Sequence, residues 1–224
     1  ILMEGFGNEI FRITKSGKGN SIAMDVSNFK SVQSIKDSIG DVDAVIHCAS
    51  SGSRGKDRIQ QYQKVYVEGC KNLVESFSDS MVLFVSSSSV YGQNDESIVD
   101  EKSKTEPPAK TSKLLLEAER IALDANGSVA RLSGIYGPGR AYLLKRYLEG
   151  NSQIDGFSSD SSGRWINQIH RDDAAQAIAH IIEKKLVNEV FNVNDDQPLL
   201  QRDCYQEFDR RFKNGIPKVR EPQK

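Results

Sequence analysis

The sequence has little cysteine and no long apolar run. Its 224 residues include three cysteines, Cys48, Cys70 and Cys204, an odd number without the C-x-x-C spacing of zinc and redox motifs. We therefore expect no disulfide framework and no metal site. We expect the three side chains to be small buried groups in a reducing cytoplasm. No apolar run approaches the roughly 20 residues that a membrane-spanning helix needs, which argues against a membrane partner.

The sequence also lacks an excess of charge of either sign. Its 30 basic residues stand against 31 acidic ones, for a formal net charge of −1. Because no basic block of the kind that follows phosphate backbones stands out, we expect no nucleic-acid partner. The hydrophobic fraction of 38% and charged fraction of 27% are those of an ordinary globular protein. A chain of this length suits one domain, or one domain with a small lobe.

Neither an initiator methionine nor the charge pattern of a signal peptide stands at the start of the sequence. Residues 1–7 (ILMEGFG) read instead like the end of a helix. We therefore expect that residues are missing upstream of Ile1.

Strand-like and helix-like segments alternate along the chain. This alternation predicts an α/β fold with a doubly wound parallel sheet, in which ligands bind beyond the carboxyl ends of the strands. The Ser-rich segment 152–163 is the best candidate for a mobile loop beside the binding site. Apolar and β-branched runs predict strands over 9–14, 21–26, 43–49, 81–85, 128–132 and 189–193, and apolar spacing predicts helices over 29–39, 58–78, 111–124, 141–148, 174–185 and 201–212.

Five motifs follow one another in a recognisable order. They are 43–49 (DAVIHCA), 86–92 (SSSSVYG), 131–140 (RLSGIYGPGR), 167–173 (NQIHRDD) and 191–195 (FNVND). Together they closely resemble the extended short-chain dehydrogenases, the NAD-dependent epimerase/dehydratase family. The resemblance covers nearly the whole chain and implies a Rossmann-like fold that binds NAD or NADP.

The resemblance also implies a division of the chain. A nucleotide-binding region is expected over 1–140, N-terminally incomplete. A small C-terminal substrate lobe is expected over 141–224, with 166–195 returning to the main domain.

The family's catalytic serine or threonine lies four residues before the tyrosine of the V-Y-G turn, a position that Ser87 occupies here. A hydroxyl at a strand end can hydrogen-bond the carbonyl or alcohol group of a substrate. Ser88 is expected among the substrate-binding residues. The alternative is that these serines only satisfy backbone groups at a strand-to-loop turn.

The family's acid/base is the tyrosine of a Tyr-x-x-x-Lys pair, whose lysine binds the nicotinamide ribose and lowers the pKa of the tyrosine. Lys113 matches the lysine, but the tyrosine position holds Ala109. Alanine cannot move a proton, and loss of a positioned acid/base costs roughly 10²–10⁴-fold in rate, which puts ordinary family catalysis in doubt. Tyr91, Tyr136 and Lys110 are candidate substitutes. Lys113 can alternatively be read as a surface lysine.

Two further departures from the family pattern are visible. Tyr66 stands where the long helix usually carries an asparagine, and Gly5 and Gly7 do not form the glycine-rich phosphate loop. We expect the missing strand and loop to lie upstream, because a parallel sheet without its central strand exposes an apolar edge. A chain complete as given would bind the cofactor only weakly. These departures resemble an atypical subgroup whose reactions are mostly unassigned.

The expected cofactor is NADP or NAD. Thr14 and Lys15 end the first predicted strand without an acidic residue, which tilts the choice toward the 2′-phosphate of NADP; the alternative is an exposed turn with an incidental lysine. By resemblance, Asp25 and Val26 flank the adenine, and Ala49 and Ser50 line the cofactor. Lys113 binds the nicotinamide ribose. The residues that face the nicotinamide are Ser133, Gly134 and Ile135.

The expected substrate-binding residues, besides Ser88, are Arg140, Asn167 and His170. A guanidinium after Gly-Pro-Gly can clamp a phosphate or carboxylate, although a surface arginine is the plain alternative. Asn167 and His170 precede two aspartates that begin a helix. His170 is more simply read as a hydrogen-bonded structural residue.

The sequence thus favours an NAD(P)-dependent oxidoreductase or epimerase-like protein that acts on a nucleotide sugar or similar hydroxylated small molecule. The alternative, favoured by Ala109, is a catalytically silent NAD(P)-binding regulatory or interaction protein. A purely structural subunit is a third reading, and a homodimer is left open.

Overall fold

The computed structural model describes residues 9–52, 55, 57–155 and 163–220. Gly5, Gly7 and most of the segment 152–163, which was expected to be a mobile loop, lie outside these residues. The chain divides into two compact units. The first comprises residues 1–132 and 175–193, and the second comprises 133–174 and 194–224.

A four-stranded parallel sheet forms the centre of the first unit. Its strands are β3 (Ala44–His47), β4 (Met81–Ser87), β5 (Ser128–Leu132) and β10 (Val190–Val193), in the order β10-β5-β4-β3. All three neighbouring pairs are parallel. Every residue of β5 is buried, as expected of a strand covered on both faces. The predicted α/β fold with a parallel sheet is confirmed.

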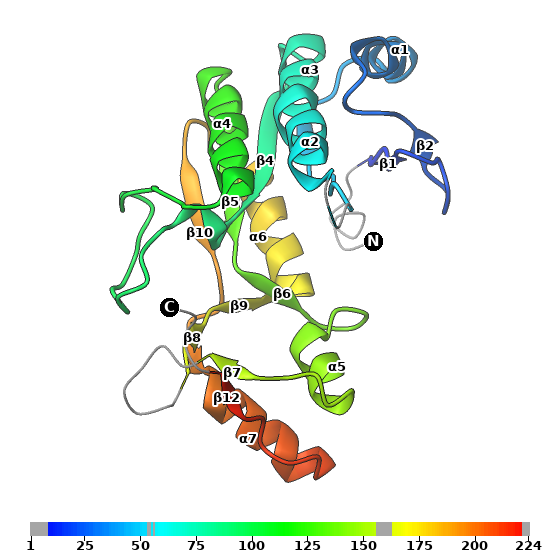
Figure 1. The fold of residues 1–224 in the computed structure, drawn as a ribbon. Coiled ribbons are helices and arrows are strands. Elements are labelled where there is room, and N and C mark those ends of the chain that lie inside the picture. The colour runs from blue at the N-terminus through cyan, green and yellow to red at the C-terminus, as the bar shows by residue number, and fades with distance from the viewer. Residues whose placement is uncertain (1–8, 53–54, 56, 156–162, 221–224) are drawn as a thin grey trace. The chain divides into compact units, whose positions relative to one another are not determined.

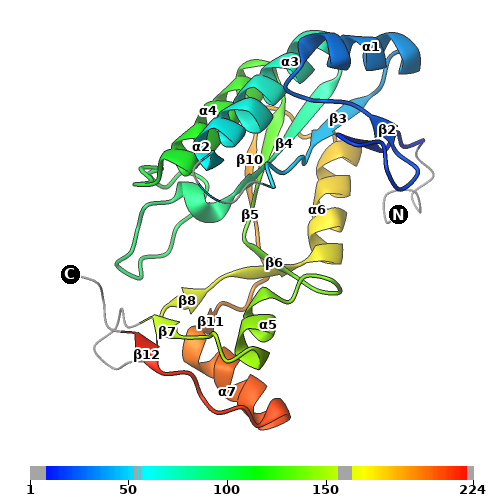
Figure 2. The ribbon, with the colours of Figure 1, turned by 45° about the vertical axis from the view of Figure 1, so that its right-hand side comes forward.

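Helices cover both faces of this sheet. Figure 2 shows α3 (Gly69–Ser76) and α4 (Lys110–Asp124) on one face and α6 (Arg171–Glu183) on the other. The core under α4 contains Cys70, Phe84, Val90, Leu115, Ala118 and Ala122. Three of these residues, Leu115, Ala118 and Ala122, recur on α4 at helical spacing, which is why this segment forms a helix and buries one face.

The N-terminal part of the first unit is less regular than predicted. The expected strands over 9–14 and 21–26 shorten to β1 (Ile13–Thr14) and β2 (Ile22–Ala23), which pair in parallel as a separate two-stranded sheet. The intervening turn contains two glycines with positive φ. Helix α1 (Phe29–Ile39) matches its prediction and begins at Asn28, whose side chain accepts from the Ser31 N–H. Figure 1 shows α1 beside β2.

The long helix predicted over 58–78 is interrupted. It comprises α2 (Arg58–Tyr62), the π-helical turn η2 (Gln63–Glu68) and α3. The Nε2 atom of His47 lies 3.0 Å from the Val65 carbonyl oxygen in this turn. A wider π-turn leaves backbone groups available to partners outside the helix, and such turns are frequent at functional sites.

The second unit is built from short strand pairs and two helices. The helices are α5 (Tyr142–Leu148) and α7 (Gln201–Phe212), and Tyr147, Ile154 and Tyr205 form the small core. The strand pairs are β6 (Gly134–Tyr136) with β9 (Gln168–His170), β7 (Ile154–Asp155) with β12 (Val219–Arg220), and β8 (Trp165–Ile166) with β11 (Leu199–Leu200).

The cysteine expectation is only partly right. Cys70 is buried and burial raises its thiol pKa to about 12, whereas Cys48 is exposed just beyond the end of β3 and Cys204 is half-buried. The expectation that all three thiols are buried is therefore wrong for Cys48, because β3 ends at His47 and Cys48 lies in the loop that follows. Within the described ranges, no helix is long and apolar enough to cross a membrane.

Candidate functional site

The ends of β1 and β2 meet in the first unit. The Met24 N–H donates to the Thr14 carbonyl at 2.9 Å, and the Lys15 ammonium lies 2.8 Å from the Asp25 carboxylate. The structure therefore brings together three of the predicted cofactor-binding residues. The hydrogen bond from Lys15 and those from Ser27 lower the pKa of Asp25, so its carboxylate is charged at neutral pH.

Asn72, on α3, was missed by the sequence analysis. Its side-chain amide donates to the Val26 carbonyl at 2.9 Å, and this fixes the turn after β2. A Cβ on Gly69 would lie 3.0 Å from the Val26 side chain, so glycine there lets the turn pack closely on the helix. Asn72 follows Gly69 by three residues, on the same helix face, and this spacing was the signal that could have identified it.

The loop after β3 carries the predicted cofactor residues Ala49 and Ser50, both exposed. The next residue, Ser51, donates its N–H to the Tyr66 hydroxyl at 3.4 Å. The Tyr66 ring also packs edge-on against the Phe84 ring, with 6.2 Å between centroids. Tyr66 therefore supports the loop with a ring and a hydroxyl that an asparagine would not supply.

Serine hydroxyls gather where β4 ends. The Ser87 oxygen accepts from the Ser89 N–H at 3.2 Å, as the cap of the short 3₁₀ turn η3 (Ser88–Val90). The Ser89 hydroxyl in turn lies 3.3 Å from that of Ser112, a buried residue of α4. This supports the structural alternative for Ser87, yet an accepted bond leaves the hydroxyl proton available for donation to a ligand. Ser112 was not singled out from the sequence.

Ala109 and Lys113 lie at the start of α4. Ala109 is the N-cap residue and its side chain makes no capping hydrogen bond, while its carbonyl accepts from the Lys113 N–H at 3.2 Å. Both residues are exposed, as is Lys110. The residue of this turn that faces the serines is Ser112.

A buried polar network joins β4, α4 and β5. Arg131 and Glu119 form an ion pair of 2.7 Å with side chains 7% and 3% exposed, and the Ser86 hydroxyl donates to Glu119 at 2.5 Å. Arg131 also donates to the Tyr91 hydroxyl at 2.9 Å, which donates to the Asn192 side chain at 2.7 Å. The Tyr91 hydroxyl therefore accepts one hydrogen bond and donates another within this network, which indicates a structural role for Tyr91.

In the second unit, the pairing of β6 with β9 brings five predicted residues together. The Gly134 N–H donates to the Asn167 carbonyl at 3.1 Å, and Ile135 pairs with Ile169 and Tyr136 with His170 across the strands. The His170 ring meets the Tyr136 ring edge-on, with 5.3 Å between centroids. A Cβ on Gly137 would collide with His170 Nε2, so this glycine makes room for the imidazole.

Of the polar residues next to β6 and β9, Ser133 is buried and Arg140 is exposed. The Ser133 hydroxyl is buried and has no hydrogen-bond partner among the described residues. Arg140 closes a tight turn through its backbone with Gly137 and is exposed. Arg171 donates to the Pro138 carbonyl at 2.9 Å. Across the part of the chain that the structure describes, no three His, Cys, Asp or Glu side chains gather as metal ligands.

Comparisons with known proteins agree with the parallel α/β fold described above. The family model for the NAD dependent epimerase/dehydratase family matches residues 7–194. A sequence search of curated proteins finds no match. Among solved structures, a candidate NAD-dependent epimerase/dehydratase from Methylobacillus flagellatus is 25% identical, with a TM-score of 0.77 over 99% of this chain and 79% of that one.

Two further structures were solved with a dinucleotide bound. UDP-glucuronic acid 4-epimerase from Bacillus cereus, in complex with NAD, is 21% identical, with a TM-score of 0.73 over 89% of this chain and 68% of that one. RMD from Pseudomonas aeruginosa, complexed with NADPH, is 20% identical, with a TM-score of 0.70 over 90% and 76% of the two chains. These two share the fold with this chain.

Proposed function

The chain belongs to the NAD-dependent epimerase/dehydratase family, as its motifs predict, and from that premise we propose that it is an NAD(P)-dependent oxidoreductase or epimerase-like enzyme of the cytoplasm. Its substrate would be a nucleotide sugar or a similar hydroxylated small molecule. The observation that carries the proposal is the gathering of Thr14, Lys15 and Asp25 at the ends of β1 and β2. Ligands of parallel α/β sheets bind beyond such strand ends.

We assign a role in this function to each predicted site residue. Asp25 and Val26 hold the adenosine part of the cofactor, and the exposed Ala49 and Ser50 border it. Ser87 donates its hydroxyl proton to a substrate oxygen, and Lys113 holds the ribose. A bound nicotinamide would supply hydride transfer.

In the second unit, Ser133, Gly134 and Ile135 border the nicotinamide, and Ser133 brings a buried hydroxyl without a partner among the described residues. Arg140, Asn167 and His170 are the substrate-binding residues of this unit, and Ser88 is the substrate-binding residue of the first unit. Tyr136 and Lys110 are the remaining candidates for proton transfer, because the Tyr91 hydroxyl is already engaged.

We propose NADP over NAD on the basis of Lys15. A 2′-phosphate is a charge-assisted acceptor that would draw the ammonium from Asp25. In fluorescence titrations of the two reduced cofactors, Lys15→Ala should weaken NADPH binding about tenfold, since a hydrogen bond to a charged group contributes roughly 1.5–3 kcal/mol, and should leave NADH binding unchanged. Lys18→Ala, in the same turn, is the control. An equal loss for both cofactors would contradict the assignment.

Catalysis is tested with a panel of nucleotide sugars and NADPH. Ser87→Ala should lower turnover about 10²-fold or more, in line with loss of one transition-state hydrogen-bond donor, while exposed Ser16→Ala should not. Turnover unaltered by Ser87→Ala would remove the catalytic role of this residue.

The second candidate function, a silent NAD(P)-binding protein, is favoured by Ala109 at the N-cap of α4. It predicts cofactor binding without turnover of any panel member. Ala109→Tyr then separates the two functions, because a large gain in turnover would show that proton transfer was the missing step. If the protein bound neither NADH nor NADPH, both candidate functions would be contradicted.

A further inference from the structure

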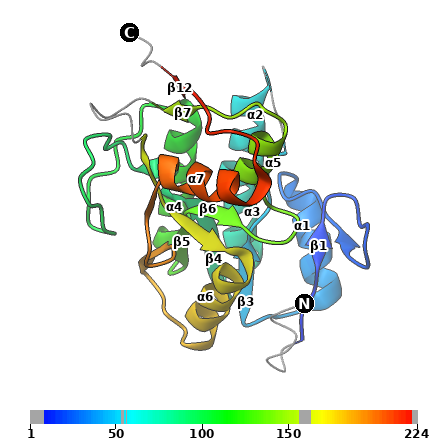
Figure 3. The same ribbon diagram turned by 90° about the horizontal axis from the view of Figure 1, so that it is seen from below.

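Three polar side chains lie in one row across the central sheet. Ser86 of β4, Arg131 of β5 and Asn192 of β10 are register partners on neighbouring strands, so their side chains project from the same face of the sheet. Figure 3 shows β4 and β5 between α4 and α6. Ser87 and Leu132 form the next row, at the last residues of β4 and β5. The polar row therefore lies one residue before the strand end that carries Ser87.

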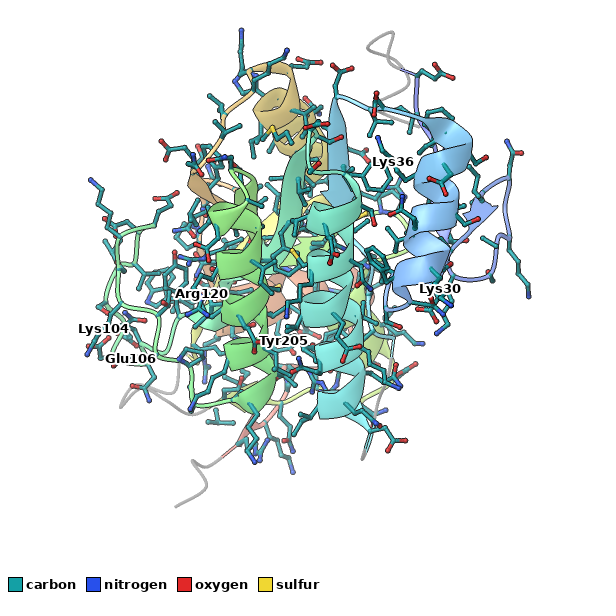
Figure 4. All side chains as sticks on the ribbon, turned by 90° about the horizontal axis from the view of Figure 1, so that it is seen from above. Lys30, Lys36, Lys104, Glu106, Arg120 and Tyr205 are labelled. Atoms are coloured by element: carbon teal, nitrogen blue, oxygen red, sulfur yellow. The ribbon has the colours of Figure 1, made fainter. Side chains whose placement is uncertain are left out.

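The polar row faces α4. Glu119, on the inner side of this helix, accepts from the Ser86 hydroxyl at 2.5 Å and pairs with Arg131 at 2.7 Å. Figure 4 labels the next residue of the helix, Arg120, which is exposed. A buried ion pair is favourable only where its remaining donors are also satisfied. The Nη1 group of Arg131 is satisfied by the Tyr91 hydroxyl, at 2.9 Å.

Tyr91 closes the short turn η3 that follows β4. Its N–H donates to the Ser88 carbonyl at 3.2 Å, and its ring centroid lies 5.1 Å from the Arg131 guanidinium. Its hydroxyl donates to the Asn192 side chain at 2.7 Å. The chain leaves the sheet at Ser87 of β4 and is attached to it again by Tyr91, through residues of β5 and β10.

The start of the same turn is fixed by Ser87. Its hydroxyl oxygen accepts from the Ser89 N–H at 3.2 Å, which leaves the hydroxyl proton free to point to a ligand. The turn is therefore held at both ends, by the Ser87 cap and by Tyr91. Because only residues 88–90 separate these two ends, a shift of Tyr91 is passed on to the Ser87 side chain.

We propose that Tyr91 is a positioning residue, which holds the turn where the Ser87 hydroxyl meets the substrate. This inference rests on the proposed function, in which Ser87 donates to a substrate oxygen. Tyr91 moves no proton itself, since its hydroxyl proton is bound by Asn192. A displacement of about 1 Å at a reacting group can cost roughly 10²-fold in rate, so a hydroxyl that only fixes a turn has weight in catalysis.

Tyr91→Phe tests the proposal, because it removes the hydroxyl and keeps the ring. In hydrogen exchange followed by NMR, the backbone amides of residues 89 and 91 should exchange about tenfold faster, the factor expected from loss of one hydrogen bond. The Phe84 amide, inside β4, should be unaffected. With the panel of nucleotide sugars, kcat should fall at least tenfold while the KM for NADPH stays the same.

Tyr62→Phe is the matched control. The Tyr62 hydroxyl also accepts from an arginine, Arg58, at 3.3 Å, and its ring packs against the core cluster that contains Val90. Neither the exchange of the turn nor kcat should change in this variant. Adding Asn192→Ala to Tyr91→Phe should have no further effect on either measurement, because the contact is already lost. A further loss would show that the two residues act independently and would overturn the proposal.

The two measurements separate this inference from the proposed function. Unchanged exchange at residues 89 and 91 in Tyr91→Phe overturns the positioning role, whether or not the protein turns over a substrate. Faster exchange with unchanged kcat overturns it as well, since the turn would then not position Ser87. A parent protein that binds NADPH and turns over no panel member contradicts the enzymatic function alone, and the exchange rates then decide whether Tyr91 holds the turn.

Discussion

His47 shows how one side chain ties the sheet to the helix that covers it. It ends β3, its ring lies 5.4 Å from the Phe84 ring, and it bonds the Val65 carbonyl in the π-helical turn. Only 2% of the residue is exposed, and this burial lowers the pKa of the imidazole from 6.5 to about 4. The imidazole is therefore neutral in the native protein at neutral pH and donates its single proton to Val65.

This low pKa predicts acid sensitivity. Since the unfolded chain takes up the proton near pH 6.5 and the native protein only near pH 4, stability is full above pH 6.5 and falls as the pH is lowered toward 4. The whole change amounts to roughly 3 kcal/mol at 1.36 kcal/mol per pKa unit. Urea unfolding at a series of pH values measures it. His47→Gln should flatten this part of the profile, exposed His180→Gln should not, and an unchanged slope in His47→Gln would contradict the assignment.

The sequence predicted the positions of the site residues better than it predicted their hydrogen-bond partners. Ser87 was located by motif spacing, and it does end β4. Whether its hydroxyl caps a turn or meets a ligand depends on Ser89 and Ser112, which only the fold brings near. Tyr91 was a candidate proton donor by residue type alone, and its partners Arg131 and Asn192 come from strands far apart in sequence.

At the scale of elements, the Glu119–Arg131 pair joins α4 to β5 and, through Ser86 and Tyr91, reaches β4 and β10. Both charges are out of water and fully engaged with one another. Taking away one partner leaves the other buried and uncompensated, which is far more costly than removing both.

Glu119→Gln should therefore lower the free energy of unfolding by about 3–5 kcal/mol, while Glu119→Leu combined with Arg131→Met should recover part of that loss. Urea or guanidinium unfolding measures both. Lys104→Ala breaks an ion pair whose side chains are 75% and 67% exposed and should change stability by about 0–1 kcal/mol. Equal effects of Glu119→Gln and Lys104→Ala would show that burial of the pair has no energetic weight.

At the scale of the whole molecule, the described structure consists of two compact units. The residues proposed to hold the adenosine part of the cofactor all lie in the first. A ligand that binds only the native protein stabilises it by mass action, so cofactor binding should be visible as a change in the stability of the chain.

NADPH at a hundred times its dissociation constant should stabilise the native state by about 2.7 kcal/mol, or roughly 5–10 °C in melting temperature for a chain of this size. Differential scanning fluorimetry measures the shift. Lys15→Ala should reduce the shift at the same NADPH concentration, and no rise with the parent protein at saturating NADPH would count against cofactor binding.

The sequence by itself determined the family, the parallel sheet and nearly every long helix, because apolar periodicity and strand-end motifs are local patterns that a 12-residue window contains. It did not determine the two-residue strands of the second unit, whose pairing rests on partners up to 65 residues away, or the interruption of the long helix at Val65. Only the tertiary structure decided that the Tyr91 hydroxyl is engaged by Arg131 and Asn192, that Asn72 supports the turn after β2, and that Ile98 is exposed in the loop between η3 and α4. Each of these depends on long-range contacts, which no local pattern encodes.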